Sequence, residues 1–414
     1  MMLRTRNANQ AAGAGQDAPV KRAATKQLPL QEKATGAEIT AVGEPAAKRR
    51  APLSELREQL SGGLVLESTR KAQQGKQDFE EKKTRVRSNS ATDYKFAAAD
   101  KFAPLEDAIE EEESTAAAGD EQVFDPAPHY DFDAENTGND FEVPCFAWDI
   151  FVYYRQREGA FKVGDYLAKH PKLSKDSRAV LVDWMIEIQE TFELNHETLY
   201  LAVKLVDIFL QHSKKAVNRS ELQLIACAAV FVASKYDERQ PPLIDDFLYV
   251  SEDAFTKEQL ETMELELLNT VAFDLGAPLS YSHVRRLAKA CKVDMQTLTL
   301  ARYVLETSLM YYEFVPASES KIAAGAFFLA LKMTDPAAEW MPVMHKYSGY
   351  AAEEVEPWMW ELNHMMYIRK EGAGVNAKLL TAFQKYSHEV FFKSAEVPLI
   401  ADKYAIDRPL TCPN

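Results

Sequence analysis

The amino-acid sequence predicts an all-α protein in which two tandem helical bundles follow a long disordered N-terminal region. Three observations lead to this prediction. Aromatic residues are nearly confined to the chain beyond residue 120, apolar residues recur there at helical spacing, and one apolar segment is repeated 97 residues further on. No stretch shows the strict alternation of apolar and polar residues that is typical of a half-buried strand.

The N-terminal region is predicted to be disordered because it cannot bury enough apolar surface. The chain has 5 Trp, 17 Tyr and 21 Phe, but only Phe79, Tyr94, Phe96 and Phe102 lie within the first 120 positions. Little burial is therefore available to offset the conformational entropy of this part of the chain. Residues 1–140 are accordingly interpreted as a disordered regulatory tail.

The formal net charge of −15 is unevenly distributed along the chain. Residues 1–100 carry 18 basic and 12 acidic side chains, whereas residues 101–140 carry 1 and 13. Basic clusters such as those at 48–50 and 82–87 can be read by nuclear import receptors, or they are simply solvated charge. The acidic stretch 106–140 is interpreted as a linker that holds the tail extended and clear of the folded part.

The folded part is predicted to consist of successive helices from about residue 145. Leu181, Trp184, Met185, Ile188 and Phe192 recur at i, i+3, i+4, i+7 and i+11. This spacing places them on one face of an amphipathic helix.

Capping and breaking residues predict the boundaries of the next helices. Asn195 is expected to be the N-cap of the second helix. Ser220–Gln223 and Thr256–Gln259 have the pattern of a capping box, and each opens an apolar helical run. Pro241-Pro242 is expected to end the helix that begins at Ser220, because a residue before proline is driven out of helical geometry.

An internal repeat suggests that the folded part arose by duplication. The segment from Ile225 to Lys235 can be laid over the segment from Ile322 to Lys332 with six of eleven positions identical. The offset is too long for a solenoid repeat and favours a duplicated small domain. Chance similarity between two alanine-rich helices is the alternative. Dense alanine allows helices to approach closely, so each copy is expected to be the central helix of its bundle.

The sequence contains no motif that predicts catalysis, a cofactor or a metal site. It has no HExxH, GxxxxGK[ST] or GxSxG pattern, its 8 His are dispersed, and its 4 Cys lack CxxC spacing. We therefore expect no catalytic residue, cofactor, structural metal or disulfide framework. The longest clean apolar run, residues 224–233, is about half of a membrane span. The acidic folded part disfavours direct binding to nucleic acid. A binding protein inside the cell is expected rather than an enzyme.

Several segments in order resemble the cyclin box. They are Arg178-Ala-Val-Leu-Val-Asp-Trp-Met185, Ala233-Ser-Lys-Tyr-Asp237, and Leu275 after Ala272-Phe-Asp. The resemblance runs from about Phe146 to Ile400 and is strongest to mitotic B-type cyclins, most of all the animal B-three subgroup. It implies two tandem cyclin folds, each a five-helix bundle: an N-terminal box at 141–275 and a C-terminal box at 276–400, followed by a C-terminal tail at 401–414.

The resemblance implies that the protein is the activating subunit of a mitotic cyclin-dependent kinase. Lys235 and Glu264 match the pair with which the family docks its kinase. Read alone, they are a lysine late in a helix and a surface glutamate. Lys332 is the equivalent of Lys235 in the repeat and is expected to be dispensable, because the family docks its kinase mainly through the first box.

Two further sets of residues are carried over from the family. Arg178 and Asp207 match an internal ion pair, which we expect to be structural. A groove for Arg-x-Leu substrates is expected to have an exposed leucine and tryptophan, and its matching residues here are Leu181, Trp184, Glu187, Arg219 and Gln223. Ser177 stands where the family usually has methionine, so docking is expected to be weakened or altered. Gln223 has a competing interpretation as the capping-box residue.

The tail contains candidate regulatory motifs. Arg50-Ala-Pro-Leu53 fits the RxxL core of a destruction box, the degron that directs mitotic cyclins to the anaphase-promoting complex, a ubiquitin ligase. Glu58 stands where the family has asparagine. Ser88 and Ser90 each follow an arginine by three residues and are possible phosphorylation sites, at which phosphate would cancel local positive charge.

Together these features predict a non-catalytic kinase activator that controls the G2/M transition in mitosis or meiosis. We expect it to be nuclear, with possible shuttling to the cytoplasm, and to be degraded through its tail. The alternative is a cyclin-fold transcription or scaffold protein without a kinase partner. That alternative predicts a basic surface that faces DNA and often a Cys-rich ribbon, and the sequence has neither.

Overall fold

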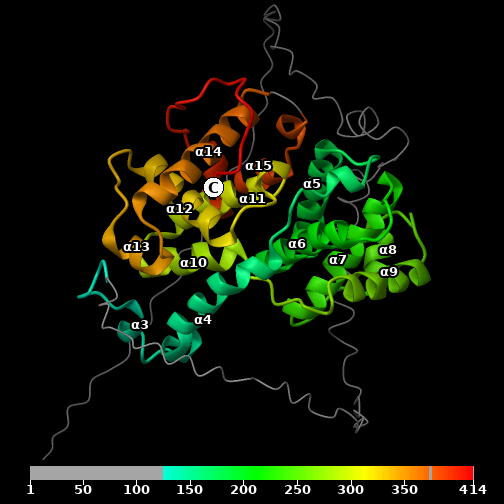
Figure 1. Cartoon of the computed structure of the whole chain (residues 1–414), viewed down its shortest axis with the longest axis horizontal. Coiled ribbons are helices and arrows are strands. Elements are labelled where there is room, and N and C mark those ends of the chain that lie inside the picture. Colours follow the sequence, from blue (N-terminus) through cyan, green and yellow to red (C-terminus); the bar gives the residue numbers. More distant parts are fainter. Residues whose placement is uncertain (1–124, 373–374, 414) are drawn as a thin grey trace, which may run out of the picture. The chain divides into compact units, whose positions relative to one another are not determined.

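The computed structural model describes residues 125–372 and 375–413, and within them every regular element is a helix. The first bundle follows a short helix and a long one, and the second bundle is followed by a short helix (Figure 1). The helices are α3 (Phe132–Glu135), α4 (Pro144–Arg157), α5 (Lys175–Thr191), α6 (His196–His212), α7 (Leu222–Asp237), α8 (Ile244–Val250), α9 (Lys257–Thr270), α10 (Ser280–Ala290), α11 (Met295–Ser308), α12 (Glu319–Thr334), α13 (Pro342–Ser348), α14 (Ala352–Lys370) and α15 (Thr381–Tyr386). The predicted all-α class with two tandem five-helix bundles, α5–α9 and α10–α14, is confirmed. The part of the predicted tail before residue 125 lies outside the described residues.

The two central helices repeat the same structure. α7 and α12 are both 16 residues long, and both of their bounds differ by the offset seen in the sequence. Each helix is almost wholly buried and packs against the other helices of its own bundle. Lys235 lies over the ring of Phe231, and Lys332 lies over the ring of Phe328 at the equivalent positions. These matches support duplication over chance similarity.

One glycine shows how closely the helices of the second bundle approach. A Cβ atom added to Gly325 of α12 would lie 2.7 Å from the Cβ of Trp358 on α14. No residue with a side chain fits at that distance without movement of one helix. The equivalent position in α7 is Ala228, which is fully buried.

The observed caps agree only in part with the predicted ones. Thr256 and Gln259 form the capping box of α9, as predicted. The box predicted at Ser220–Gln223 is wrong, because the backbone N–H of Asn218 donates to the Glu221 carboxylate at 2.7 Å and a short 3-10 turn then leads into α7. Asn195 is the N-cap residue of α6, but its side-chain amide donates to Asp237 and caps no N–H group.

Residues 125–142 pack against the second bundle, which corrects the prediction that the tail extends to residue 140. Phe132 is buried, and its backbone N–H donates to the hydroxyl of Tyr347 at 2.7 Å. Tyr130 donates from its hydroxyl to the carbonyl of Ala290 at 2.6 Å. Four acidic side chains of the segment pair with bases on or near α10 and α13: Asp125 with Lys346, Asp133 with Arg286, Glu135 with Lys292, and Glu142 with Lys289. The second bundle therefore neutralises part of the acidic charge that suggested an extended linker.

The C-terminal segment after residue 400 is bound to α14. The Arg408 guanidinium donates to both carboxylate oxygens of Glu361, at 2.7 and 2.6 Å. The buried ring of His364 lies between Asp402 and the carbonyl of Arg408. None of the described helices is long and apolar enough to cross a membrane.

Candidate functional site

The first candidate site is an ion pair between the last turn of α7 and the middle of α9. Lys235 lies in the last turn of α7, where the helix dipole favours a cation. Its ammonium lies 3.9 Å from the centroid of the Phe231 ring and forms an ion pair with Glu264 of α9. The Lys235 side chain is 41% exposed and that of Glu264 is 17% exposed. The two residues predicted to act as a pair are thus in direct contact within the chain.

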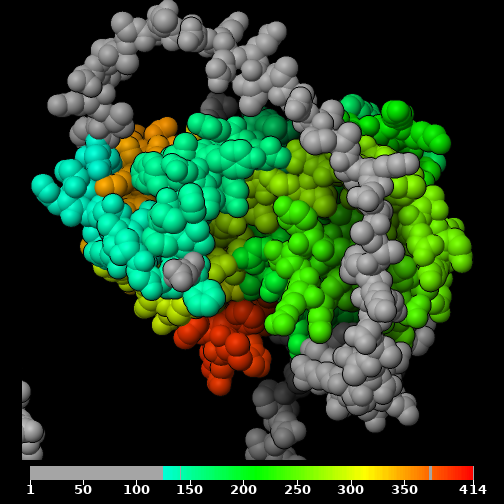
Figure 2. Space-filling view, turned by 90° about the horizontal axis from the view of Figure 1, so that it is seen from below, coloured from blue at the N-terminus to red at the C-terminus, as the bar shows by residue number. Residues whose placement is uncertain are grey.

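Two large apolar side chains next to the paired residues in the sequence are open to solvent. Tyr236 follows Lys235 and is 59% exposed, and Leu265 follows Glu264 and is 58% exposed. Burial raises the pKa of Tyr154 on α4, and Tyr236 adds to this effect. Figure 2 shows the blue-green atoms of the α3–α4 region beside the green atoms of the first bundle on one face. The other exposed apolar residues of the first bundle and of α4 include Tyr153, Leu243, Tyr249 and Phe273.

Exposed apolar groups with a charge pair among them suit the binding of another protein. A contiguous exposed apolar patch on a soluble protein commonly marks the binding site of a partner. The Lys235–Glu264 pair holds its charges in place before binding, so less side-chain entropy is lost on association. We define Lys235, Tyr236, Glu264 and Leu265 as the α7–α9 face.

The predicted groove differs from expectation because its apolar residues are buried. Leu181 is 7% exposed and Trp184 is 3% exposed, and both belong to the hydrophobic core of the first bundle. The expectation that both are exposed is therefore wrong: they lie on the inward face of α5. Glu187 and Arg219 are partly exposed. Gln223 is buried, and its side-chain amide nitrogen has no hydrogen-bond partner among the described residues.

Ser177 has a local structural role that the sequence analysis did not foresee. The Ser174 side chain accepts from the Ser177 backbone N–H at 3.1 Å, and the Ser177 hydroxyl accepts from the Ser174 backbone N–H at 2.9 Å. This is a capping box with serine at both positions, and it starts α5.

The competing capping interpretation of Gln223 is wrong, because Glu221 occupies that role in the turn that leads into α7.

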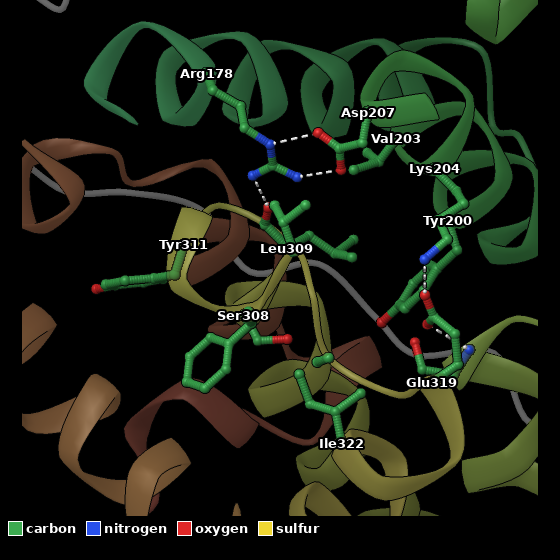
Figure 3. Close-up of a pocket in the computed structure, with 14 residues that line it drawn as sticks. Arg178, Tyr200, Val203, Lys204, Asp207, Ser308, Leu309, Tyr311, Glu319 and Ile322 are labelled. Carbon is green, nitrogen blue, oxygen red and sulfur yellow. Dashed lines mark hydrogen bonds and ion pairs between the residues drawn. The ribbon is translucent and has the colours of Figure 1, made fainter. Parts of the chain in front are cut away.

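Arg178 and Asp207 form a bidentate ion pair between α5 and α6 (Figure 3). The two nitrogen–oxygen distances are 2.8 and 2.7 Å, and each side chain is 6% exposed. The remaining terminal nitrogen of Arg178 donates to the carbonyl of Leu309 at 2.7 Å, just after α11 of the second bundle. Tyr166 donates to Asp207 at 2.7 Å. The pair therefore also joins the two bundles, a role that sequence reasoning missed.

A small polar cavity lies next to this pair, between the bundles. Its volume is about 50 Å³, and Figure 3 shows its lining residues converging from α6 and from the start of α12. Lys204 donates to Glu319 across it at 2.9 Å. The hydroxyl group of Tyr200 has no hydrogen-bond partner among the described residues. A polar cavity of this size suits a few ordered waters rather than a substrate.

A second buried ion pair at the bundle boundary was also missed. The Lys385 ammonium lies 2.6 Å from a carboxylate oxygen of Glu306 and 2.7 Å from the amide oxygen of Gln189. Tyr386 donates to the other oxygen of Glu306 at 2.9 Å, and His196 lies 3.4 Å from it. Burial alone would raise the pKa of Glu306, but Lys385 and His196 overcome this effect and hold that pKa at about 2. No spacing in the sequence relates these residues.

The described residues offer no arrangement for catalysis by a metal. They contain no group of three or more His, Cys, Asp and Glu that could hold a metal ion. Cys227 is fully buried in α7, and burial raises the pKa of its thiol, which makes it a poor nucleophile. The predicted destruction box at Arg50 and Leu53 and the possible phosphorylation sites at Ser88 and Ser90 lie outside the described residues.

Comparison with known proteins identifies both bundles. Residues 149–276 match the family model "Cyclin, N-terminal domain" and residues 278–399 match "Cyclin, C-terminal domain". The chain is 51% identical over 283 residues to the G2/mitotic-specific cyclin-B3 of Caenorhabditis elegans, covering 68% of this chain and 72% of the relative. It is 45% identical over 278 residues to that of Drosophila melanogaster, covering 66% of this chain and 47% of the relative. A viral cyclin structure from herpesvirus saimiri matches with a TM-score of 0.46 at 22% identity, covering 57% of this chain and 99% of the viral one.

Proposed function

The chain belongs to the cyclin family, and from that membership we propose that it activates a mitotic cyclin-dependent serine/threonine kinase at the G2/M transition. Members of this family are regulatory subunits and not catalysts, so this chain is a regulatory subunit as well. The similarity to G2/mitotic-specific relatives supports the cell-cycle stage.

The α7–α9 face is the single observation that carries the kinase assignment. It brings the two charged residues of the family's kinase-docking pattern into contact, and the residue that follows each of them in the chain is a large, exposed apolar one. In the proposed complex the kinase covers Tyr236 and Leu265 and takes Lys235 and Glu264 out of water. Removing one partner of such a desolvated charge pair costs about 2–5 kcal/mol of binding free energy.

Activation by binding is a population shift. The chain binds the active arrangement of the kinase better than the inactive one, and the difference in affinity sets how far the equilibrium moves. A shift from 1:99 to 99:1 requires about 5.5 kcal/mol of differential affinity. An interface of standard size supplies binding energy of that order.

The kinase assignment is tested by pull-down of the tagged full chain from dividing cells, followed by a histone kinase assay. We expect Lys235→Ala with Glu264→Ala to abolish kinase co-purification while circular dichroism stays native. Lys332→Ala is the matched control, because Lys332 makes the same contact with a phenylalanine ring in the second bundle and should leave activation unchanged.

A charge exchange separates docking from folding. Lys235→Glu with Glu264→Lys keeps an attractive pair within the chain but reverses the charges presented to a kinase. We expect this variant to fold but to co-purify no histone kinase activity. Full kinase activity in either double variant contradicts the assignment, and co-purification of transcription factors without any kinase would favour the alternative function.

We further propose that Arg219, Gln223 and Glu187 contribute to a weakened groove for Arg-x-Leu substrates. The unpartnered amide of Gln223 supports this proposal, because a backbone carbonyl of the peptide would satisfy it once the buried side chain turns outward. The burial of Leu181 and Trp184 leaves less apolar surface for the leucine of the peptide. Fluorescence polarisation with a labelled Arg-x-Leu peptide measures the affinity.

Two proposals concern the tail. The first is that Arg50 and Leu53 form a destruction box read by the anaphase-promoting complex, which Arg50→Ala with Leu53→Ala tests as turnover through mitotic exit. The second is that the basic clusters direct the chain to the nucleus and that phosphate on Ser88 or Ser90 weakens this import. Imaging of a Ser88→Asp/Ser90→Asp variant beside a Ser88→Ala/Ser90→Ala variant tests the second proposal, since equal nuclear levels would contradict it. For the first proposal, unchanged turnover of the Arg50→Ala/Leu53→Ala variant would point to another degron.

A further inference from the structure

Two loops of the first bundle carry a local excess of positive charge. Residues 162–175 hold four Lys and one Asp, and residues 212–219 hold two Lys, one Arg and no acid. The chain from residue 141 onward has 29 basic and 38 acidic side chains, so this excess runs against the overall sign. We call these two segments the basic loop pair.

Buried contacts hold the two loops side by side. The ring of His170 is fully buried: its Nδ1 accepts from the backbone N–H of Val217 at 2.9 Å, and its Nε2 donates to the carbonyl of Leu210 at 2.7 Å. The backbone N–H of Gly164 donates to the side-chain oxygen of Gln211 at 2.5 Å. The lysines of both loops therefore stand on one fixed framework, which lowers the entropy that binding would cost.

The positive charge of the loops is largely uncompensated within the described residues. Lys175 pairs with Glu313, and the only acid of the loops, Asp165, accepts from the hydroxyl of Tyr312. Lys172, Lys214 and Lys215 are exposed and form no ion pair in the described part of the chain. Uncompensated like charges on neighbouring loops repel one another, so a negatively charged partner gains binding free energy here.

The chemistry of the patch favours a particular kind of partner. Its charges are almost all lysine ammonium groups, which act as point charges, whereas phosphate recognition commonly uses the arginine fork. The acidic remainder of the folded part would repel a long polyanion such as DNA. We propose that the basic loop pair docks a short acidic segment, rich in Asp and Glu, of a partner protein.

The first loop leads into α5, which carries Ser177, and the second ends at Arg219 in the 3-10 turn before α7, which carries Gln223. The proposed surface therefore borders the proposed groove and adds charge recognition beside it. The proposal does not rest on the kinase assignment, because the patch lies on loops that contain neither Lys235 nor Glu264. Its test contains no kinase.

The test is fluorescence polarisation of a labelled hexaglutamate peptide with the purified full chain at low salt. We expect Lys172→Glu/Lys214→Glu/Lys215→Glu to weaken binding by about tenfold or more, and added salt to weaken binding to the wild type. The matched control is Lys257→Glu/Lys370→Glu/Lys378→Glu, which changes the net charge equally at exposed sites elsewhere. It should stay within about twofold of the wild type.

Three outcomes would overturn the proposal. Equal weakening by the two triple variants would mean that net charge alone attracts the peptide. Unchanged binding by the loop variant, with native circular dichroism, would mean that the patch is not the site. A phosphoserine peptide of the same net charge that binds about tenfold more tightly would assign the surface to phosphopeptides instead of carboxylates.

Discussion

The ammonium of Lys385 and the carboxylate of Glu306 form an ion pair from which solvent is excluded. Their closest atoms are 2.6 Å apart, and the side chains are 2% and 0% exposed. Glu306 belongs to α11 of the second bundle and Lys385 to α15, while Gln189 of the first bundle accepts from the same ammonium. One buried charge pair thus fixes α15 and both bundles in a single arrangement.

Loss of this pair is expected to be strongly destabilising. Glu306→Gln should lower the free energy of unfolding at pH 7 by about 3–5 kcal/mol, because Lys385 stays buried without a counter-charge. Urea unfolding followed by circular dichroism measures the change. Glu389→Gln is the control, since its side chain is 84% exposed and its pair with Lys393 is on the surface. That control should change the free energy by less than about 0.5 kcal/mol.

The pKa values of Glu306 and of His196 beside it predict how stability depends on pH. The pKa of Glu306 is held at about 2, below its ordinary 4.5, so the unfolded chain takes up this proton first and stability falls between these values. Burial lowers the pKa of His196 below its ordinary 6.5, so the unfolded chain also takes up that proton first. Both groups stabilise the fold at neutral pH and lose that effect on acidification. A urea midpoint that does not fall as the pH is lowered from 7 to 3 would contradict this prediction.

Arg178→Ala is expected to destabilise the fold and to affect activity only through that loss. The substitution leaves Asp207 buried without its partner and breaks the bond to Leu309, at a cost of about 3–5 kcal/mol. Lys175→Ala removes an ion pair whose lysine is 60% exposed and should cost less than about 1 kcal/mol. At a temperature where the Arg178 variant is folded, its kinase binding should equal that of the wild type. Lost binding by the folded variant would give Arg178 a direct role.

Gly325→Ala is expected to lower stability although alanine is the better helix former. The gain in helix propensity is about 1 kcal/mol, whereas overpacking against Trp358 costs about 1–3 kcal/mol. Thermal unfolding of the full chain measures the balance. Gly159→Ala is the control, because nothing lies within 4 Å of its added Cβ. A higher melting temperature for Gly325→Ala would show that α12 and α14 separate easily.

Ser177→Met distinguishes the role of position 177 in capping α5 from its role in docking an Arg-x-Leu peptide. Loss of the Ser177 hydroxyl removes half of the capping box and should cost about 0.5–1 kcal/mol of stability. The methionine side chain restores apolar surface, so an Arg-x-Leu peptide should bind more tightly. The control Ser177→Ala loses the cap without adding that surface and should not improve binding. Equal peptide affinity for all three proteins would show that position 177 does not limit docking.

Features that depend on residues close together in the chain could be predicted from the sequence. The repeat located the two central helices, and the Thr256–Gln259 box located the start of α9, because the residues of each signal belong to a single helix or its cap. The Ser220 box was misplaced by two residues because several polar side chains there compete for the same N–H groups.

Features that depend on distant residues could not be predicted from the sequence. Lys385 and Glu306 are 79 positions apart, and Arg178 and Leu309 are 131 apart. Charged residues are normally exposed, so nothing in their local sequence indicated burial. The acidic residues of 125–142 suggested repulsion because the bases that neutralise them come from another part of the chain. The pair Arg178–Asp207 was foreseen only through the family resemblance.

The attachment of residues 125–142 decides where a mechanical load enters the molecule. A pull on the chain ahead of Asp125 is borne first by Lys346, Tyr347 and Arg286 of the second bundle, through the bonds that hold this segment. An unfolding motor that grips the N-terminal end must break those bonds before force reaches α4 and the first bundle. The α7–α9 face therefore bears no force at the start of such unfolding. The contacts of residues 125–142 with α10 and α13 have to break first.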